Sequence, residues 1–449
     1  MFVNLLLITL GKTVSKISQS LNRGNGSTWP GHIALKANKN FIRDILANSK
    51  IKIIIVAGTN GKTTTAGLIR TGLEKTGKKV IQNDSGANLL NGIASTLLLH
   101  TNENGKLTQD YAIFEVDENA LPKVLNQITP DYLVLLNLFR DQLDRYGEIN
   151  IISENWQKAI AKLSEKTKLI LNADDPQIAY IGIFEKEKKQ SNEILYFSLS
   201  AETTNIQSLQ AADSVTCPKC GNKLIFKSRT FSHLGEWHCN KCGLQRPKSA
   251  ISSLSYYPLS GMYSKYNTHA SALILKDLGM DKKMIDDAFK TFTPAFGRQE
   301  IIKYQEKNVQ IFLSKNPTSF NQSYQTIKDL HTLAQRSSKS EVGSTLLIVL
   351  NDRIPDGRDV SWIWDIDLAE LEKFKQIFVT GDRVYDMALR LKYELGNVNY
   401  EKKVKTFEFL NDAIDIALSQ ILFQETLYIL PTYSAMLDAR KILTGKKIL

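Results

Sequence analysis

The segment at residues 58–63 brings together the residue types that hold a phosphate group. It reads Gly-Thr-Asn-Gly-Lys-Thr. The glycines allow a tight turn whose backbone N–H groups point inward, and a helix that starts there attracts anions through its free amides and its dipole. Lys62 can place a positive charge on the β- and γ-phosphates, and the Thr63 hydroxyl can ligate Mg²⁺. We therefore predict a site for a nucleoside triphosphate with Mg²⁺.

Two elements must position this turn. Residues 53–56 are an apolar β-branched run that predicts a buried parallel strand, and residues 63–76 continue as a helix. The general P-loop has another glycine five residues before Gly61, where this chain has Val56, so the match is to the shorter pattern G-T-N-G-K-T. A chance Gly-Lys-Thr turn is the alternative. The strand before the turn and the helix after it argue against that alternative.

Acidic and amide side chains follow three further predicted strands. The carboxyl ends of parallel strands meet at one edge of an open sheet, which is where such folds bind ligands. A carboxylate beside the phosphate turn can be the second protein ligand of a nucleotide-bound Mg²⁺, and Glu115 in YAIFEVDE has that position. The four aspartates between residues 141 and 175 are explained equally well as loop caps and turn formers. The other residues at this edge are Asp117, Glu118, Asn137, Asp141, Asp144, Asn172, Asp174 and Asp175.

All four cysteines of the chain fall in one short window. They form two C-x2-C pairs, Cys217 with Cys220 and Cys239 with Cys242, with eighteen residues between the pairs. This spacing is typical of a zinc ribbon in which four thiolates close a tetrahedral site, so we predict a structural Zn²⁺. Two disulfides are the alternative, but a chain with a nucleotide turn and no secretion signal is expected in a reducing compartment.

A zinc ribbon can also bind nucleic acid, and this window is rich in basic residues. Binding of single strands also needs aromatic side chains on which bases stack, and only Phe226, Phe231 and Trp237 are available. We therefore expect no nucleic-acid partner, although the charge alone does not exclude one. His233 and His238 lie between the cysteine pairs, and we interpret them as bystanders because four thiolates already satisfy the metal. The basic residues of the window are Lys219, Lys223, Lys227, Arg229, Lys241, Arg246 and Lys248.

The composition is that of a globular chain long enough for two or three domains. Its 449 residues are 43% hydrophobic and 23% charged, and the net charge of +11 suits an anionic ligand or an anionic membrane surface. The run FVNLLLITL is too short to cross a bilayer and lacks the flanks of a signal peptide. We predict a cytoplasmic protein, with peripheral attachment at the inner face of the cell membrane left open.

The first helical pattern could present one face to a partner. We expect this face to pack on the protein core, and an amphipathic membrane anchor is the alternative. The face would contain Phe2, Leu5, Leu6, Thr9, Thr13, Ile17 and Leu21.

Taken together, these motifs resemble the Mur ligase family, the ATP-dependent amide-bond-forming ligases of peptidoglycan synthesis and their folylpolyglutamate synthase relatives. The resemblance covers nearly the whole chain. It rests on GTNGKT, on the strand-end Glu115, on LNLFRDQLDRYG and LNADDP, on Asn267 in SGMYSKYNTHAS, and on the GRQE segment at 297–300. The resemblance implies that Asn267 and Arg298 bind the adenosine end of ATP and that Thr63 and Glu115 bind Mg²⁺. It also implies that the triphosphate is bound by Thr59, Asn60, Gly61, Lys62, Thr63 and Thr64.

Within this family the chain is similar to the MurT-type subunits of lipid II isoglutaminyl synthases. One feature is the four-cysteine ribbon inserted in the central domain, and another is the set KNPTSFNQ, NDRIPDGRDVSWIWD and TGDRVYDMALRLKY. The third is that only about fifty residues precede the first strand, which is too few for a separate UDP-reading domain. The resemblance implies that the substrate is lipid II. The α-carboxylate of the D-glutamate in its stem peptide would become an amide.

The chemistry follows from the lack of a leaving group on a carboxylate. ATP must first convert the carboxylate to an acyl phosphate, which ammonia can then attack. Lys62 and the metal held by Glu115 would neutralise the γ-phosphoryl group as it moves, and positioning supplies most of the remaining catalysis. We therefore interpret Lys62 and Glu115 as catalytic residues.

The ammonia must come from elsewhere if every cysteine is committed to zinc. Glutamine-hydrolysing amidotransferases of the common class need a reactive cysteine thiolate. The resemblance names a GatD-type glutamine amidotransferase as the partner, and it implies that an aspartate of this chain completes the partner's Cys-His pair. Asp356 in PDGRD is our candidate and Asp359 is the second. A plain turn at Asp356-Gly357 is the alternative.

We predict an α/β protein with a Mur-ligase-like, doubly wound P-loop domain and a smaller Rossmann-like α/β domain. The expected parts are an N-terminal arm at 1–40, a central domain at 41–297 with the ribbon inserted at 213–247, and a C-terminal domain at 298–449. In the C-terminal domain, buried strands are expected at 346–350, 376–380 and 427–430. ATP would lie at the domain junction, with Lys315, Asn316 and Asp382 as weaker candidates to line the cleft.

Two other functions remain open at this point. A folylpolyglutamate-type or other amino-acid ligase would use the same turn and Glu115 without a glutaminase, but the ribbon and DGRDVSWIWD argue against it. A nucleic-acid-stimulated P-loop ATPase would use the ribbon and the positive charge. The asparagines and aspartates at the strand ends argue against that function.

Overall fold

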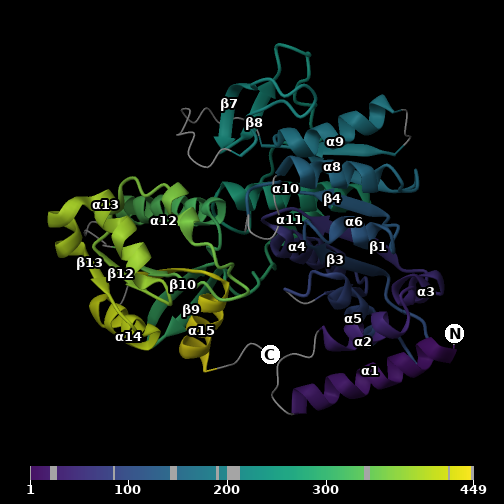
Figure 1. Cartoon of the computed structure of the whole chain (residues 1–449), viewed down its shortest axis with the longest axis horizontal. Coiled ribbons are helices and arrows are strands. Elements are labelled where there is room, and N and C mark those ends of the chain that lie inside the picture. The colour runs from purple at the N-terminus through teal and green to yellow at the C-terminus, as the bar shows by residue number, and fades with distance from the viewer. Residues whose placement is uncertain are drawn as a thin grey trace.

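The computed structural model describes residues 2–20, 28–83, 86–141, 149–188, 192–199, 213–337, 344–422 and 425–445. Two α/β domains lie side by side, and a small β hairpin projects from the first of them (Figure 1). Two residues named above, Leu21 and Asp144, lie outside the described residues, as do the side chains of Phe2 and Ile17. The predicted boundaries of the arm, the domains and the insert stay predictions.

The first domain is built on a six-stranded parallel sheet with the order β2-β3-β1-β4-β5-β6. Its strands are β1 (Lys52–Ala57), β2 (Val80–Gln82), β3 (Tyr111–Val116), β4 (Tyr132–Leu135), β5 (Lys168–Asn172) and β6 (Ile194–Phe197). Its helices are α1 (Phe2–Ser20), α2 (Trp29–Ala37), α3 (Phe41–Ala47), α4 (Lys62–Lys75), α5 (Leu90–His100), α6 (Leu121–Leu125), α8 (Ile149–Ile160), α9 (Pro176–Glu187), α10 (Met262–Asp277) and α11 (Lys282–Phe289).

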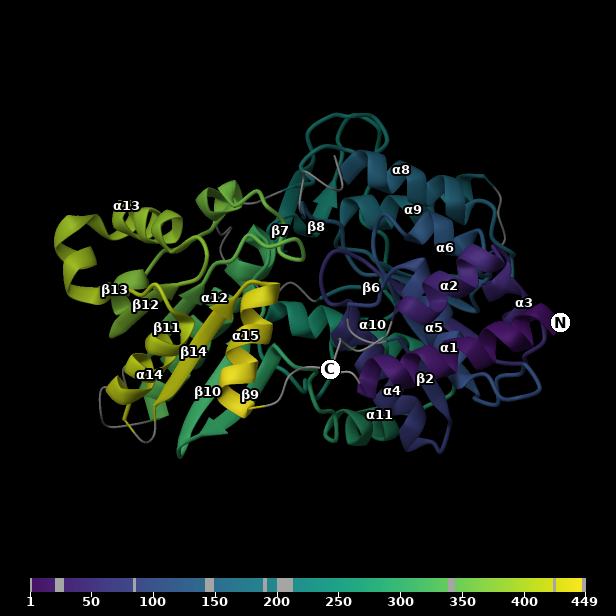
Figure 2. The same ribbon diagram turned by 60° about the horizontal axis from the view of Figure 1, so that its bottom comes forward.

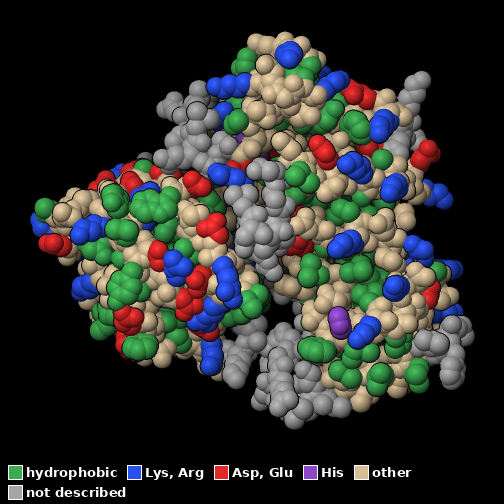
Figure 3. Space-filling view, viewed as in Figure 1, with side chains coloured by type: hydrophobic (Ala, Val, Ile, Leu, Met, Phe, Trp, Pro, Cys, Tyr) green, Lys and Arg blue, Asp and Glu red, His purple; other side chains and the backbone are tan. Residues whose placement is uncertain are grey.

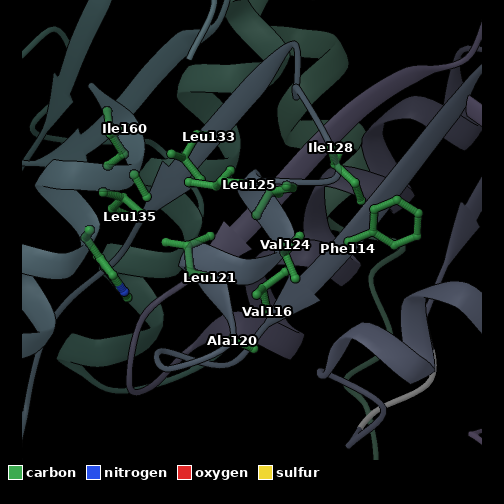
Figure 4. Packing of buried hydrophobic residues seen from close by; sticks show 14 of the residues in the cluster. Phe114, Val116, Ala120, Leu121, Val124, Leu125, Ile128, Leu133, Leu135 and Ile160 are labelled. Carbon is green, nitrogen blue, oxygen red and sulfur yellow. The ribbon is translucent and has the colours of Figure 1, made fainter. Parts of the chain in front are cut away.

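The central strand β1 is buried on both faces of this sheet, as its β-branched sequence predicts. Ile53 and Ile55 point into the core that includes α5, α6, α8 and α9. Ile54 and Val56 point into the opposite core, which includes α4, α10 and α11. Figure 4 shows side chains of β3, α6 and β4 packing together in the first of these cores. Because both faces are covered, the carboxyl edge of the sheet is the side left for a ligand.

Helices α1 to α3 form an outer layer on the first domain. Figure 2 shows α1 and α2 beside α5, and α2 packs against both α1 and α5. The prediction that α1 packs on the core is correct, but the buried face is a different one. Leu7 and Ile8 are buried, whereas Leu6, Thr9 and Thr13 of the predicted face are exposed.

The second domain has a six-stranded sheet with the order β13-β12-β11-β14-β10-β9, in which only the β9–β10 pair is antiparallel. Its strands are β9 (Arg298–Tyr304), β10 (Lys307–Phe312), β11 (Thr345–Val349), β12 (Gln376–Thr380), β13 (Val404–Thr406) and β14 (Thr426–Pro431). Its helices are α12 (Pro317–Ser337), η1 (Ser361–Asp365), η2 (Leu371–Lys373), α13 (Val384–Lys403), α14 (Leu410–Gln420) and α15 (Tyr433–Thr444). The predicted C-terminal α/β fold and its three strands are confirmed.

Candidate active site

The phosphate turn links β1 to α4 at the carboxyl edge of the first sheet. Gly58 and Gly61 both have positive φ angles, 142° and 93°. A β-carbon at Gly61 would collide with the Asn267 side chain of α10, so this position requires glycine for space as well as for backbone conformation. The turn and the asparagine helix predicted to bind ATP therefore lie in direct contact.

The end of the neighbouring strand β4 holds the turn in place. The Asn137 side chain accepts a hydrogen bond from the Asn60 backbone N–H and donates one to the Asn60 carbonyl, each 3.0 Å long. The Thr59 N–H donates to the Asn137 carbonyl at 3.0 Å, and the Phe139 N–H donates to the Thr59 hydroxyl at 3.0 Å. Asn137 therefore orients the turn.

Lys62 extends back over the turn that it follows. Its ammonium donates to the carbonyls of Gly58 at 2.5 Å and Thr59 at 3.2 Å, and it pairs with Glu118 at 3.3 Å. The Glu118 carboxyl is buried, and burial raises its pKa even though Lys62 opposes that shift. The lysine charge is thus fixed beside the turn, where a β- or γ-phosphate would lie.

The two predicted Mg²⁺ ligands are brought together on adjoining elements. The Thr63 hydroxyl, at the start of α4, donates to Glu115 Oε2 at 2.7 Å, and Gln82 donates to Glu115 Oε1 at 3.1 Å. Burial raises the pKa of Glu115, while the hydrogen bond from Thr63 lowers it. A hydroxyl and a carboxylate oxygen at this spacing form the hard-oxygen donor set that Mg²⁺ takes beside a nucleotide. The residues present therefore fit the metal.

A second lysine reaches the site from the other domain. Lys315, between β10 and α12, pairs with Asp141 at 2.5 Å. Burial lowers the pKa of Lys315, but Asp141 and Glu118 outweigh it and raise the pKa on balance, so the lysine stays charged. Lys62 and Lys315 thus flank the buried carboxylates that follow β3 and β4. Such a paired arrangement can counter the charge of a transferring phosphoryl group and of a carboxylate substrate.

These groups line a cavity of about 390 Å³ between the two domains. That volume is in the range of small-molecule sites. Burial lowers the pKa of Arg298 on the cavity wall, and nearby Glu115 opposes that shift. Asn267 Oδ1 is buried without a hydrogen-bond partner among the described residues, so it is available to a ligand. The predicted site residues on the wall are Thr59, Asn60, Gly61, Lys62, Thr63, Thr64, Glu115, Asn267, Arg298 and Lys315.

Several wall residues were not found by sequence reasoning. Tyr433 at the start of α15 and Gln299 in β9 both line the cavity. Gln299 has a φ of 62°, and its side chain donates to the Ser260 carbonyl at 2.8 Å, which ties the second domain to the loop before α10. Gln299 belongs to the GRQE segment, so the sequence motif could have identified it as a site residue. No motif near Tyr433 indicates a role in the site.

Other predicted positions serve the structure around the site. Asp175 accepts hydrogen bonds from the first turn of α9 and from the Leu138 N–H at 2.8 Å. Asp174 pairs with Arg246 of the ribbon at 2.5 Å. Asn316 caps the Ser319 N–H at 2.7 Å and is not on the cavity wall. Asp382 pairs with Arg353 at 2.8 Å at the surface of the second domain.

Asp356 is buried and hydrogen-bonded within its own domain. It is 3% exposed, and its two carboxylate oxygens accept hydrogen bonds from the Ser434 N–H at 2.7 Å and the Ser434 hydroxyl at 2.5 Å. Burial raises the pKa of Asp356, and the bonds from Ser434 lower it. Its neighbour Pro355 is on the cavity wall. Asp359 is exposed, and Ser361 donates hydrogen bonds to it, among them one from the Ser361 N–H at 2.8 Å.

The four cysteines converge on the ribbon formed by β7 (Ile225–Phe231) and β8 (Leu234–His238). All four are free thiols whose sulfur atoms lie within 4.8 Å of one another, so the disulfide alternative is wrong and the cluster can hold a metal ion. Burial raises the pKa of Cys217 to about 12, while the Cys242 backbone N–H lowers that of Cys239 to about 6. A bound cation would favour thiolates at all four positions.

The ribbon is fastened to the residues that follow β5, at the same carboxyl edge of the sheet as the phosphate turn. The Trp237 indole is buried and donates to the Ala173 carbonyl at 3.1 Å, and the Gly235 N–H donates to the Asp174 carbonyl at 3.1 Å. His233 is fully buried against Phe139, with ring centroids 4.4 Å apart. Trp237 is therefore not free to stack on bases, and His233 packs in the interior outside the four-cysteine cluster. We interpret the ribbon as a structural element that stabilises the site.

We expect one Zn²⁺ per chain in elemental analysis of the purified protein. Cys239→Ser should lose the metal and lower the unfolding temperature, because the site closes the ribbon that braces residues 173–174. His238→Ala should keep the metal, since the four thiols complete the coordination. Purified protein without zinc, or a Cys239→Ser variant with full metal content, would contradict the prediction.

Comparison with known proteins places the chain in a family. The Mur ligase middle domain matches residues 56–274, and the MurT ligase C-terminal domain matches residues 313–436. The lipid II isoglutaminyl synthase (glutamine-hydrolyzing) subunit MurT of Staphylococcus aureus (strain COL) is 34% identical, with 86% of each chain covered. The subunit of the same name from Streptococcus pneumoniae (strain ATCC BAA-255 / R6) is 32% identical, with 99% of this chain and 98% of that protein covered.

Solved structures agree on the fold. A pseudomurein peptide ligase type C from Methanothermus fervidus has a TM-score of 0.62 at 21% identity, covering 88% of this chain and 79% of that one. A Mycobacterium tuberculosis folylpolyglutamate synthase complexed with ADP and AMPPCP has a TM-score of 0.58 at 15% identity, covering 90% and 94%. With the two matching domains and the high coverage of its relatives, this chain belongs to the MurT branch of the Mur ligase family.

Proposed function

We propose that this chain is the ligase subunit of a lipid II isoglutaminyl synthase. It would use ATP to amidate the α-carboxylate of the D-glutamate in the lipid II stem peptide, which yields D-isoglutamine for peptidoglycan synthesis. The observation that carries the proposal is the cavity between the domains, where Lys62, the Thr63–Glu115 pair and Lys315 face one space. The relatives named for this activity support it over most of the chain.

The reaction divides into two steps that these residues can serve. In the first step a substrate carboxylate oxygen attacks the γ-phosphorus of ATP, which gives an acyl phosphate and ADP. In the second step ammonia attacks the acyl carbon, phosphate leaves with the bonding electrons, and the nitrogen loses a proton. Lys62 would hold the β- and γ-phosphates, and Lys315 would orient the carboxylate. The Mg²⁺ held by Thr63 and Glu115 would neutralise phosphate charge.

The turn is also held in position before ATP binds. Asn137 fixes the turn through the Asn60 backbone, so the amides that receive phosphate are oriented before ATP binds. Asn267, which contacts the turn at Gly61, and Arg298 would hold the adenosine end of ATP. The buried carboxylates near Lys62 would keep its charge in place between turnovers. Positioning of this kind supplies much of the rate of phosphoryl transfer.

We propose that the ammonia comes from a GatD-type glutamine amidotransferase subunit. The names of the MurT relatives include glutamine hydrolysis, and all four cysteines of this chain belong to the ribbon. An aspartate of this chain would complete the partner's Cys-His pair. As the structure stands, Asp359 is the accessible carboxylate of the PDGRD segment, whereas Asp356 is buried against Ser434.

The proposed substrate also bears on location. No helix in the described ranges is both long and apolar enough to cross a bilayer. We propose that the subunit works in the cytoplasm, at the inner face of the membrane that carries lipid II. We expect no nucleic-acid partner, because the described aromatic rings of the ribbon pack against the protein or lie beside Arg229.

Reconstitution tests the proposal. The purified chain with ATP, Mg²⁺, lipid II and ammonium should form ADP and amidated lipid II, identified by mass spectrometry of the released stem peptide. Glutamine should replace ammonium only after the amidotransferase subunit is added. A folylpolyglutamate-type ligase would instead turn over with an amino acid and no ammonia. ATP hydrolysis without amidated product under all of these conditions would overturn the proposal.

A further inference from the structure

Helix α1 presents an apolar stripe to solvent. Leu6 is 63% exposed and Leu10 is 49% exposed, and Thr9 and Thr13 lie between and beyond them at helical spacing on the same face. The two threonine hydroxyls donate to the carbonyls of Leu5 and Thr9, so the stripe offers no unpaired polar side chain. Trp29, at the start of α2, is 65% exposed. We call Leu6, Thr9, Leu10, Thr13 and Trp29 the arm surface.

The opposite side of α1 is firmly attached to the domain. Leu7 and Ile8 are buried in the core, and Gly11 packs against the Leu98 side chain of α5. Asn4 donates to Asp44 at 3.1 Å, which orients the helix about its axis. The exposed leucines therefore follow from a fixed orientation of the helix.

The first fifty residues carry an unusual share of the positive charge. They contain seven basic residues against a single acidic one, which is a net charge of +6 out of the +11 of the whole chain. The acidic residue is Asp44, whose hydrogen bonds from Asn38 and Asn4 lower its pKa. Figure 3 shows hydrophobic side chains over α1 and α2 with Lys and Arg side chains beside them. The basic residues are Lys12, Lys16, Arg23, Lys36, Lys39, Arg43 and Lys50.

The arm surface is connected to the mouth of the cavity. Gly31, two residues after Trp29, packs against the Asn91 carbonyl and donates to the Ser95 hydroxyl at 2.7 Å. That contact places the start of α2 beside the first turn of α5. The residues just before α5, Asn88 and Leu89, line the cavity, and Leu89 is 50% exposed. The start of α2, which carries Trp29, therefore lies close to the part of the cavity wall formed by Asn88 and Leu89.

We propose that the arm surface docks on the surface of an anionic lipid bilayer, with the cavity mouth next to it. Apolar stripes flanked by basic residues insert at the headgroup boundary, where tryptophan is also favoured, and the positive charge adds attraction to anionic lipids. This inference rests on the proposed function, because a lipid-linked substrate would then meet the cavity without leaving the membrane. The charge of the first fifty residues selects a bilayer over a second copy of this chain, which carries the same charge.

Flotation with lipid vesicles tests the docking directly. The purified chain, alone and with its amidotransferase subunit, should float with vesicles of phosphatidylglycerol and phosphatidylcholine and much less with phosphatidylcholine alone. The double variant Leu6→Gln, Leu10→Gln should bind anionic vesicles about tenfold more weakly or worse. Lys36→Glu with Lys39→Glu should weaken binding and reduce its dependence on salt.

Matched controls lie on the second domain. Leu389→Gln with Val398→Gln removes two exposed apolar side chains of α13, and Lys402→Glu with Lys405→Glu makes the same charge change. Both controls should bind vesicles like the parent chain. Absence of binding to anionic vesicles, or equal loss in arm and control variants, would overturn the proposal. It would also be overturned if the leucine variants disrupted self-association or amidotransferase binding and left vesicle binding unchanged.

The test of membrane docking can fail or succeed independently of the test of the proposed function. Amidation of lipid II in detergent with ammonium should be equal in the parent and in the arm variants, whereas turnover of lipid II in vesicles should fall with the loss of docking. Normal amidation in detergent without vesicle binding would overturn only the docking. Vesicle binding without any amidation would overturn only the proposed function.

Discussion

Lys62→Ala should reduce ATP-dependent amidation by about a thousandfold, because removal of a charged group that acts on a transferring phosphoryl typically costs that much. The fold should persist, since the lysine contacts carbonyls of its own turn and Glu118. Burial raises the pKa of Glu118, so this carboxyl can take up a proton when its partner is removed. The measurement is single-turnover ADP formation with lipid II and ammonium, together with circular dichroism and binding of the amidotransferase.

Lys75→Ala is the matched control, because this lysine is exposed at the far end of the same helix. It should keep full activity. Glu115→Gln should lose a comparable share of the amidation activity and should need a higher Mg²⁺ concentration for what remains. This substitution keeps the shape of the ligand and removes its charge. If Lys62→Ala or Glu115→Gln turned over ATP like the parent chain, the assignment of the phosphate and metal site would be wrong.

Asp359→Asn should abolish turnover with glutamine and leave turnover with ammonium nearly unchanged. An exposed carboxylate on the second domain can orient and charge-stabilise a histidine across an interface, and loss of that charge in a catalytic triad costs about 10⁴-fold. The structure changes the expectation for Asp356→Asn. Its carboxylate holds the start of α15 through Ser434, next to Tyr433 on the cavity wall. This variant should lower both activities and destabilise the chain by about 1–3 kcal/mol.

The comparison of nitrogen sources in the reconstituted pair separates the two aspartates. A selective loss with Asp356→Asn would restore it as the residue that serves the partner, as the sequence first suggested, and would require the segment to rearrange in the complex. Equal loss with both sources for Asp359→Asn would assign that residue to the ligase site or to the fold. Full activity of both variants would make PDGRD an ordinary turn.

The sequence by itself determined the features whose residues are neighbours along the chain. The strand–turn–helix around residues 58–63 is local, because glycine conformation and helix start depend on the residues within it. The paired C-x2-C spacing likewise fixes two knuckles that can present thiolates together. The position of Glu115 followed from the residue pattern of one strand and from the rule that the carboxyl ends of parallel strands meet at one edge of the sheet. These parts agree with the structure.

Only the tertiary structure decided which distant residues share the cavity. Lys315 pairs with Asp141 across 174 positions, and Tyr433 reaches the wall because α15 starts where β14 ends beside β11. The burial of Asp356 depends on Ser434, which lies 78 positions away. No local pattern encodes such pairings, because they follow from how two sheets and their helices pack against each other.

The orientation of α1 is decided in the same way. Apolar residues occur on more than one face of this helix, so its sequence allowed two packing faces of similar hydrophobicity. The anchor of Asn4 on Asp44 and the fit of Gly11 against Leu98 select the face with Leu7 and Ile8. The periodicity determined that a helix forms and packs. Which leucines remain in water was settled by contacts with residues thirty to ninety positions away, and those contacts exist only in the folded chain.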